Sequence, residues 1–183
     1  MSTLIALKDN KTKKLYMGCE SQTTAGNQKT YSNMSKMFRK KTHAGDIVIG
    51  ISGRCSFHQI IQHDLDYNVA HSDNISYIRN LASQIREISE KLKLKSKEKG
   101  TVLIIFNNGI YTLEKDYYVA DLNDFYAIGS GGRFALGAMS ALTKTKRTNK
   151  LSPEEMIKIS IESACDHDCY SSGDLEIETL KIK

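Results

Sequence analysis

The chain has an apolar run within a few residues of its N-terminus. Met1-Ser2-Thr3 leads directly into Leu4–Leu7, which reads Leu-Ile-Ala-Leu. Chain ends generally fray unless neighbouring structure holds them, so this run predicts a buried strand that fixes the N-terminus in the core. If Met1 is removed, Ser2 carries a hydroxyl nucleophile and its own α-amine as the base, which is the N-terminal nucleophile arrangement. An ordinary structural start is the alternative interpretation of the same residues.

Composition predicts one ordinary globular domain over residues 1–183. The chain is 40% apolar and 26% charged, which separates it from disordered and membrane-spanning sequences. Lys8 and Lys11 interrupt the early apolar stretch, so no signal peptide is expected. The four cysteines are scattered and do not resemble a disulfide framework. We therefore expect a protein of the reducing cytoplasm.

The net charge of +5 raises the question of a nucleic-acid partner. Lysine and arginine cluster over residues 36–41, 91–99 and 144–150. The second cluster alternates with apolar residues in the manner of a helix end, where basic residues are favoured in any case. Solvated protein faces are the better interpretation, and neither a nucleic-acid nor a membrane partner is expected.

Apolar periodicity predicts an ordered series of strands and helices. The order is strands, two helices, strands, two helices and a final strand. The expected strands cover 3–8, 14–19, 46–52, 101–106, 109–114, 124–129 and 175–182, and the expected helices cover 56–70, 75–94, a segment around 135–141 and a segment that begins at the capping sequence 152–155. This order packs as two antiparallel sheets between two helix pairs, which is an α+β, four-layer αββα sandwich.

Three further segments carry a resemblance to a known family. They are Gly18–Asn27 (GCESQTTAGN), Ile128–Gly132 (IGSGG) and Asp168–Gly173 (DCYSSG). In this order they resemble a strand and turn, a Gly-Ser-Gly turn and an Asp-x-Tyr-Ser segment of proteasome β subunits and of HslV, the peptidase half of a bacterial ATP-dependent protease. The resemblance extends from Ser2 to about residue 180, and it implies the αββα sandwich of the N-terminal nucleophile hydrolases.

The resemblance implies a catalytic role for Ser2 and two charged residues. Ser2 would attack a peptide carbonyl while its α-amine accepts the proton, directly or through water. Lys36 would favour the deprotonated hydroxyl and amine by its charge, and Glu20 would hold Lys36 charged. A purely structural salt bridge is the alternative for Glu20 and Lys36.

Four further matches complete the implied site. Gly50 would present its backbone N–H to the developing oxyanion. Ser130, Asp168 and Ser171 would orient the terminal amine and relay protons. Ser130 taken alone also fits a simple helix N-cap.

The chain departs from the family pattern in several places. Most active members carry threonine where Ser2 stands, so the nucleophile loses the methyl group that restricts χ1. Glu20 replaces the commoner aspartate, Ser172 replaces a glycine, and the hairpin before Glu20 is about two residues longer. A chain that keeps Met1 has no free amine on Ser2 and cannot act by this mechanism.

One cluster near the C-terminus invites a metal-site interpretation. Cys165, His167, Asp168 and Cys169 lie close together in sequence but lack the paired Cys-x-x-Cys units of structural zinc sites. The resemblance instead implies that backbone carbonyls of Cys165, Asp168 and Ser171 hold a monovalent cation such as sodium. No cofactor is expected to be required.

The resemblance also implies an assembly. The family closes homo-oligomeric rings around its active sites through heterologous interfaces, so we expect a hexamer or heptamer, single or doubled. The implied partners are an AAA+ unfoldase and unfolded polypeptide substrate. The alternative hypothesis is a catalytically inactive ring protein of the same fold with an assembly or regulatory role.

Overall fold

The computed structural model describes residues 2–26, 28–31, 34–145 and 151–182. The elements in chain order are β1 (Leu4–Asp9), β2 (Lys14–Glu20), β3 (Gln22–Ala25), β4 (Gln28–Tyr31), β5 (Met37–Thr42), β6 (Gly45–Ser52), α1 (Cys55–His63), α2 (Asn74–Lys91), the 3₁₀ turn η1 (Ser96–Glu98), β7 (Thr101–Phe106), β8 (Gly109–Leu113), β9 (Val119–Leu122), β10 (Phe125–Ile128), α3 (Gly132–Lys144), α4 (Pro153–His167) and β11 (Leu175–Lys181).

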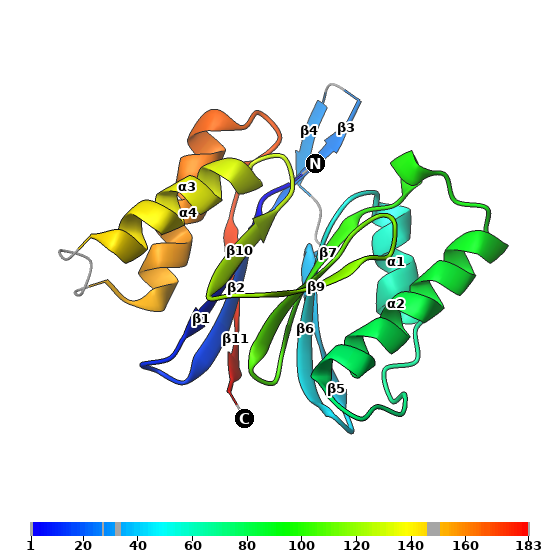
Figure 1. Ribbon diagram of the computed structural model, residues 1–183. Helices are drawn as coiled ribbons and strands as arrows, with labels where there is room; N and C mark the ends of the chain where they lie inside the picture. The colour runs from blue at the N-terminus through cyan, green and yellow to red at the C-terminus, as the bar shows by residue number, and fades with distance from the viewer. Residues whose placement is uncertain (1, 27, 32–33, 146–150, 183) are drawn as a thin grey trace.

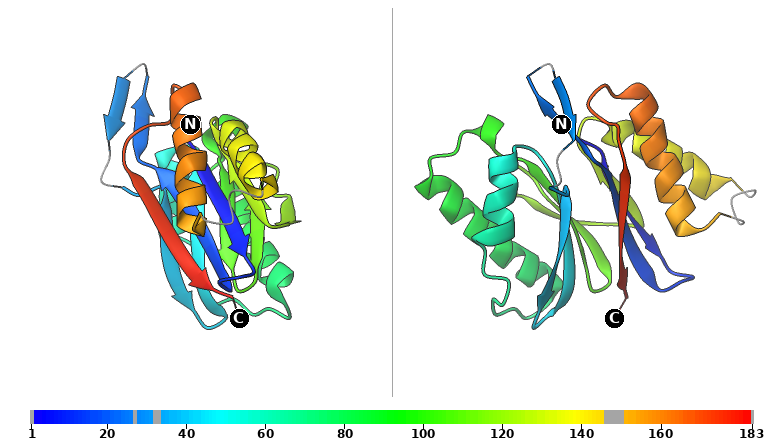
Figure 2. Two further views of the ribbon diagram at one scale, coloured as in Figure 1. Left: turned by 90° about the vertical axis from the view of Figure 1, so that its left-hand side faces the viewer. Right: turned by 180° about the vertical axis from the view of Figure 1, so that it is seen from behind.

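Two antiparallel sheets lie face to face at the centre of the molecule (Figure 1). One has the strand order β10-β1-β2-β11, and the other has the order β5-β6-β7-β8-β9. Helices α3 and α4 cover the outer face of the first sheet, and α1 and α2 cover the outer face of the second, as the views in Figure 2 also show. The predicted α+β, αββα sandwich is therefore confirmed.

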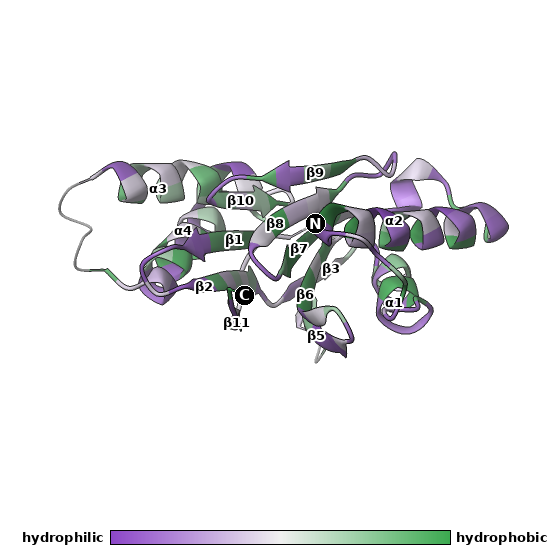
Figure 3. Ribbon diagram, turned by 60° about the horizontal axis from the view of Figure 1, so that its bottom comes forward, coloured by the Kyte–Doolittle hydropathy of each residue, from purple (hydrophilic) through white to green (hydrophobic). Residues whose placement is uncertain are grey.

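The opening apolar run forms a strand that is buried on both faces. Leu4 and Ala6 face the core between the two sheets, whereas Ile5 and Leu7 face α3 and α4. Successive side chains of a strand point to opposite faces, so a strand in an inner layer needs apolar residues at every position. Figure 3 shows the same hydrophobic colouring along β7 and β10.

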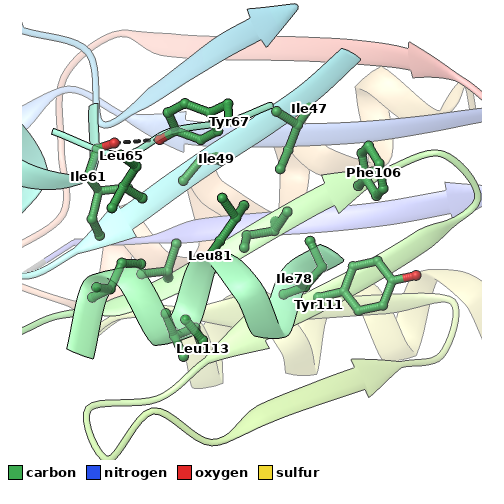
Figure 4. Close-up of a cluster of buried hydrophobic side chains, with 14 of the residues drawn as sticks. Ile47, Ile49, Ile61, Leu65, Tyr67, Ile78, Leu81, Phe106, Tyr111 and Leu113 are labelled. Atoms are coloured by element: carbon green, nitrogen blue, oxygen red, sulfur yellow. Dashed lines mark hydrogen bonds between the residues drawn. The ribbon is translucent and has the colours of Figure 1, made fainter. Parts of the chain in front are cut away.

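The core under α1 and α2 explains one difference from the predicted elements. The helix expected over 56–70 ends at His63, and the chain then turns inward to bury Leu65 and Tyr67 (Figure 4). Tyr67 donates its hydroxyl hydrogen to Ile61 O. Asp66 accepts from Asn68 N at 2.8 Å, and such local side-chain bonds compete with helix continuation.

The other predicted strand boundaries lie within one residue of the structure, the helix expected over 75–94 ends earlier, at Lys91, and the capping sequence is confirmed. Ser152 Oγ accepts from Glu155 N at 3.2 Å, and Glu155 Oε2 accepts from Ser152 N at 2.7 Å, which is a capping box with Pro153 at the first helical position. The sequence interpretation missed β3, β4, β5 and β9. No helix within the described parts of the chain is both long and apolar enough to cross a membrane.

Candidate active site

Ser2 lies two residues before the first residue of β1 and lines a cleft of about 950 Å³. One wall of the cleft is β3 with the turn after it, residues 22–26. Residues 51–56, which end β6 and start α1, form another wall, and Gly129 and Ser130 close the cleft beside Ser2. The β3–β4 hairpin projects from the end of the molecule at which the chain starts (Figures 1 and 2).

Thr3 points away from this cleft and anchors the start of β1. Its side chain is fully buried, and its Oγ1 lies 2.7 Å from Ser171 Oγ. Its backbone N–H donates to Glu20 Oε1 at 3.0 Å. Ser2 and Thr3 are both hydroxyl residues at the N-terminus, and of the two it is Ser2 that lines the cleft.

Glu20 is a fully buried carboxylate with several donors around it. Oε1 accepts from Thr3 N and from Lys36 Nζ. Oε2 accepts from Gln22 N at 2.7 Å and from Ser172 N at 3.4 Å. A buried charge requires a counter-charge and hydrogen bonds to offset its lost hydration, and this carboxylate has both.

This ion pair lies directly beside Ser2. Thr3 N is separated from Ser2 Cα by two covalent bonds, so the Glu20 carboxylate lies within about 6 Å of Ser2 Cα. Lys36 also lines the cleft, and its side chain is 11% exposed. Its backbone is fixed because Lys36 O accepts from Ile51 N at 2.9 Å. A charge at this range can change the protonation of a neighbouring group.

Three polar residues predicted for the site form a second cluster behind Thr3. Asp168 Oδ2 accepts from Ser130 Oγ and from Ser171 Oγ, each at 2.7 Å. A carboxylate only accepts, so Ser171 uses its proton on Asp168 and in turn accepts from Thr3 Oγ1. The hydrogen-bond chain therefore runs from Thr3 through Ser171 to Asp168, with Ser130 on the same oxygen.

The Gly-Ser-Gly turn fits tightly against the backbone of residues 2 and 3. Gly129 has φ +93°, and a Cβ there would lie 1.9 Å from Ser2 O. A Cβ on Gly131 would lie 2.0 Å from Thr3 Oγ1. The glycines are needed because the turn backbone touches the start of β1.

We expect Gly129→Ala to lower the free energy of unfolding by about 2–4 kcal/mol, because it combines a positive φ with an overlap on Ser2 O. Gly137→Ala is the matched control. Gly137 is exposed within α3 and has open space at its Cβ position, so alanine there is expected to stabilise by about 0.5–1 kcal/mol. Urea unfolding of both variants at one protein concentration measures the difference, and equal effects would contradict the packing argument.

The structure places Gly50 away from the cleft, so its predicted position needs correction. Gly50 lies inside β6, opposite Met37 on β5 and Leu103 on β7. A Cβ there would lie 2.6 Å from Leu4 Cδ2, which puts this face of Gly50 in the core between the sheets. Gly53, just beyond the end of β6, lines the cleft instead. Gly53, three positions after Gly50, is thus the glycine of this segment that shares the cleft with Ser2.

The structure adds residues that sequence reasoning did not assign to the site. Gln22 is fully buried, and its N–H donates to Glu20 and to Ser172 O at 2.9 Å. Ser172, noted only as a departure from a glycine, donates from Oγ to Gln22 Oε1 at 2.5 Å. These bonds join the segment after α4 to β3. The two consecutive β-branched residues of β3, Thr23 and Thr24, were the available signal for a strand.

Two cysteines near the site, Cys19 and Cys165, are poor nucleophiles and poor metal ligands. Burial, with a further contribution from Glu176, raises the pKa of Cys19 to about 12. Burial first, and then the charge of Glu20, raise the pKa of Cys165 to about 11. Metal binding needs the thiolate, and within the described ranges no three His, Cys, Asp or Glu side chains are grouped to hold a metal ion.

The predicted monovalent-cation site uses backbone carbonyl oxygens, so it does not depend on the side-chain ligands discussed above. Cys165 lies in the last turn of α4, where carbonyls lack intrahelical donors, and Asp168 and Ser171 follow it. Asp168 O accepts from Ser171 N at 3.0 Å and keeps a second lone pair. The donor chemistry fits a monovalent cation, and its binding stays a prediction.

Comparison with known proteins finds a relative in the family that the sequence motifs resemble. The chain is 25% identical over 185 residues to the ATP-dependent protease subunit HslV of Campylobacter concisus, with 98% of each chain covered. The chain is a relative of the proteasome β-subunit and HslV-type family. No protein-family model matches it.

Two solved structures show that this relationship extends to the fold. BPH of Thiobacillus denitrificans, in complex with epoxomicin, superposes with a TM-score of 0.83 at 21% identity and covers 99% of both chains. The eukaryotic HslV of Trypanosoma brucei gives a TM-score of 0.71 at 18% identity, over 98% of this chain and 99% of that one. The fold of this family therefore describes the whole chain.

Proposed function

We propose that the chain is a peptidase of the N-terminal nucleophile type that cleaves unfolded polypeptide with Ser2 after removal of Met1. The observation that supports this most is the position of Ser2, on the cleft and beside the buried Glu20–Lys36 pair. The HslV relative is a subunit of an ATP-dependent protease, and BPH binds epoxomicin, which is consistent with such an activity.

In the proposed reaction, Ser2 Oγ attacks the peptide carbonyl and its proton passes to the α-amine. The C–N bond then breaks, the amine product takes that proton, and water hydrolyses the ester that remains on Ser2. Lys36 supplies positive charge beside the forming alkoxide. We assign the oxyanion contact to the Gly53 N–H rather than to Gly50, because Gly53 shares the cleft with Ser2. Ser130, Asp168 and Ser171 position the start of β1 through Thr3.

We also propose that the active form is a cytoplasmic homo-oligomeric ring, a hexamer or heptamer that is single or doubled, which works with an AAA+ unfoldase. The fold shared with HslV supports this assembly. Light scattering at micromolar concentration tests it, and a monomer would contradict it. A sodium ion on the carbonyls of Cys165, Asp168 and Ser171 would stiffen the turn that carries the polar cluster.

The experiment that tests the peptidase proposal is intact-mass analysis of the natively expressed protein before and after treatment with epoxomicin. The expected result is a chain that begins at Ser2 and gains one inhibitor molecule, because the reagent requires a hydroxyl and a free α-amine together. Ser2→Ala is the control and stays unlabelled.

The second candidate function is an inactive ring protein of the same fold. The peptidase mechanism requires a free α-amine on Ser2, and Ser2 has none while Met1 is attached. If the native chain keeps Met1, and if artificial exposure of Ser2 gives neither labelling nor hydrolysis, an assembly or regulatory role replaces the peptidase proposal.

A further inference from the structure

The charged side chains that line the cleft all have the same sign. In the part of the chain that the structure describes, they are Lys36, Arg54, Lys97, Lys99 and Lys115, and no aspartate or glutamate lines the cleft. Lys36 is neutralised by Glu20. Among the described residues, the other four form no ion pair. The cleft therefore carries a net positive charge beside Ser2.

The arrangement of the five-stranded sheet brings this charge together. Ser52 at the end of β6 is paired with Thr101 at the start of β7, and β7 is paired with β8, which ends two residues before Lys115. Arg54, Lys99 and Lys115 therefore extend from the same end of three adjacent strands.

Two glycines bring Arg54 and Lys99 closer still. A Cβ on Gly53 would lie 2.6 Å from Gly100 Cα, so the backbones of the two turns are in direct contact. Lys99 Nζ lies 4.4 Å from the ring centroid of Tyr117, and this cation–π contact helps to hold that side chain at the cleft.

The neighbouring carboxylates are engaged elsewhere. Glu114 accepts from Thr101 Oγ1 at 3.3 Å, and Asp116 accepts from Tyr118 N at 3.1 Å. Both line an adjacent hollow rather than the cleft. Glu98 accepts from Lys95 N at 2.8 Å. His58 also lines the cleft, but burial lowers its pKa, with a smaller contribution from His63, so it adds no charge near neutral pH.

We infer that the cleft selects polypeptide segments that carry aspartate or glutamate next to the bond to be cleaved. This inference rests on the proposed peptidase function and specifies its substrate class. Carboxylate side chains would bind to Arg54, Lys97, Lys99 and Lys115 as the segment lies along the cleft. Attraction of this kind depends on ionic strength, because exposed charges are screened by salt.

The test compares fluorogenic peptides that differ only by glutamate, glutamine or lysine beside the scissile bond. The processed enzyme is expected to show a kcat/KM about tenfold higher for the glutamate peptide than for the glutamine peptide at low salt, as several exposed charge pairs together would give. The preference is expected to shrink as salt is raised. Equal rates for all three peptides would overturn the inference and leave the peptidase proposal intact.

A variant that lacks three of the positive charges in the cleft tests whether these residues cause the preference for glutamate. Arg54, Lys97 and Lys115 are exposed, so the triple variant R54Q/K97Q/K115Q should fold, and its glutamate-to-glutamine ratio is expected to fall to near one. Lys158→Gln, on the exposed face of α4, is the matched control and should leave the ratio unchanged. An equal loss of preference in both variants would show a general charge effect rather than recognition in the cleft.

A binding measurement keeps the inference testable if no peptide is cleaved. Fluorescence anisotropy with the Ser2→Ala protein compares the same peptides without turnover, and about tenfold tighter binding of the glutamate peptide is expected. Equal binding would refute the inference. Tighter binding of a single-stranded oligonucleotide than of the acidic peptide would reassign the basic cleft to a nucleic-acid ligand.

Discussion

Ser2→Ala is expected to lower kcat for small peptides by at least about 10⁴-fold in the processed chain, because it removes the attacking oxygen and leaves the fold unchanged. Ser2 is small and 5% exposed, and it lies at the start of β1 rather than inside the sheet. The measurement is steady-state hydrolysis of a fluorogenic peptide, with circular dichroism as the check on folding. Ser2→Thr should keep or raise activity, since the added methyl group restricts χ1.

Thr3 supplies the control for this experiment. Its Oγ1 is committed to Ser171 and its side chain is fully buried, so Thr3→Ser should retain the hydrogen-bond chain and most of the activity. Full activity in Ser2→Ala would leave the N-terminal mechanism without support. If Thr3→Val then abolished that activity, the nucleophile would move to Thr3 despite its buried position.

The second large effect is expected from Lys36→Met, which leaves Glu20 buried without a counter-charge. Loss of one partner of a buried ion pair typically costs about 3–5 kcal/mol of unfolding free energy. Three backbone N–H groups still donate to Glu20, so we expect about 3 kcal/mol, measured by urea unfolding. Peptide hydrolysis should fall with it, because Ser2 loses the positive charge beside its hydroxyl.

A double variant separates the structural role of this pair from its catalytic role. Adding Glu20→Gln to Lys36→Met removes both charges and should recover stability, whereas hydrolysis should stay low. Arg86→Ala breaks an ion pair whose side chains are more than 60% exposed and should change stability by less than about 0.5 kcal/mol. Recovery of activity in the double variant would show that the pair is only a structural salt bridge.

The parts of the fold that could be predicted from sequence are those in which local pattern and burial agree. Leu4–Leu7 and the two strands of the hairpin 101–113 lie in inner layers, where nearly every position is buried and most are apolar. The missed strands β3, β4, β5 and β9 lie at sheet edges or in the separate hairpin, and their exposed polar residues give no apolar alternation. The end of α1 at His63 depends on the packing of Tyr67, which no local pattern reveals.

The candidate site also has some residues that sequence motifs could predict and others that depend on tertiary packing. A resemblance of short motifs found Glu20, Lys36 and the polar cluster of Ser130, Asp168 and Ser171, which the structure brings to the start of β1. It pointed to Gly50 rather than Gly53, because Gly50 lies inside β6 near its end, Gly53 lies just beyond that end, and only the packing of the sheets distinguishes them. The bonds of Thr3, Gln22 and Ser172 join distant segments and have no signature in sequence.

The site is built from the two ends of the chain, with Thr3 bonded to Ser171 and Glu20 to Ser172. A ribosome makes these segments at the beginning and near the end of translation. While the chain is still being extended, the carboxylate of Glu20 lacks one of its donors and Thr3 lacks its acceptor. Both bonds therefore form only after the segment that follows α4 has been synthesised, and a shorter nascent chain lacks them.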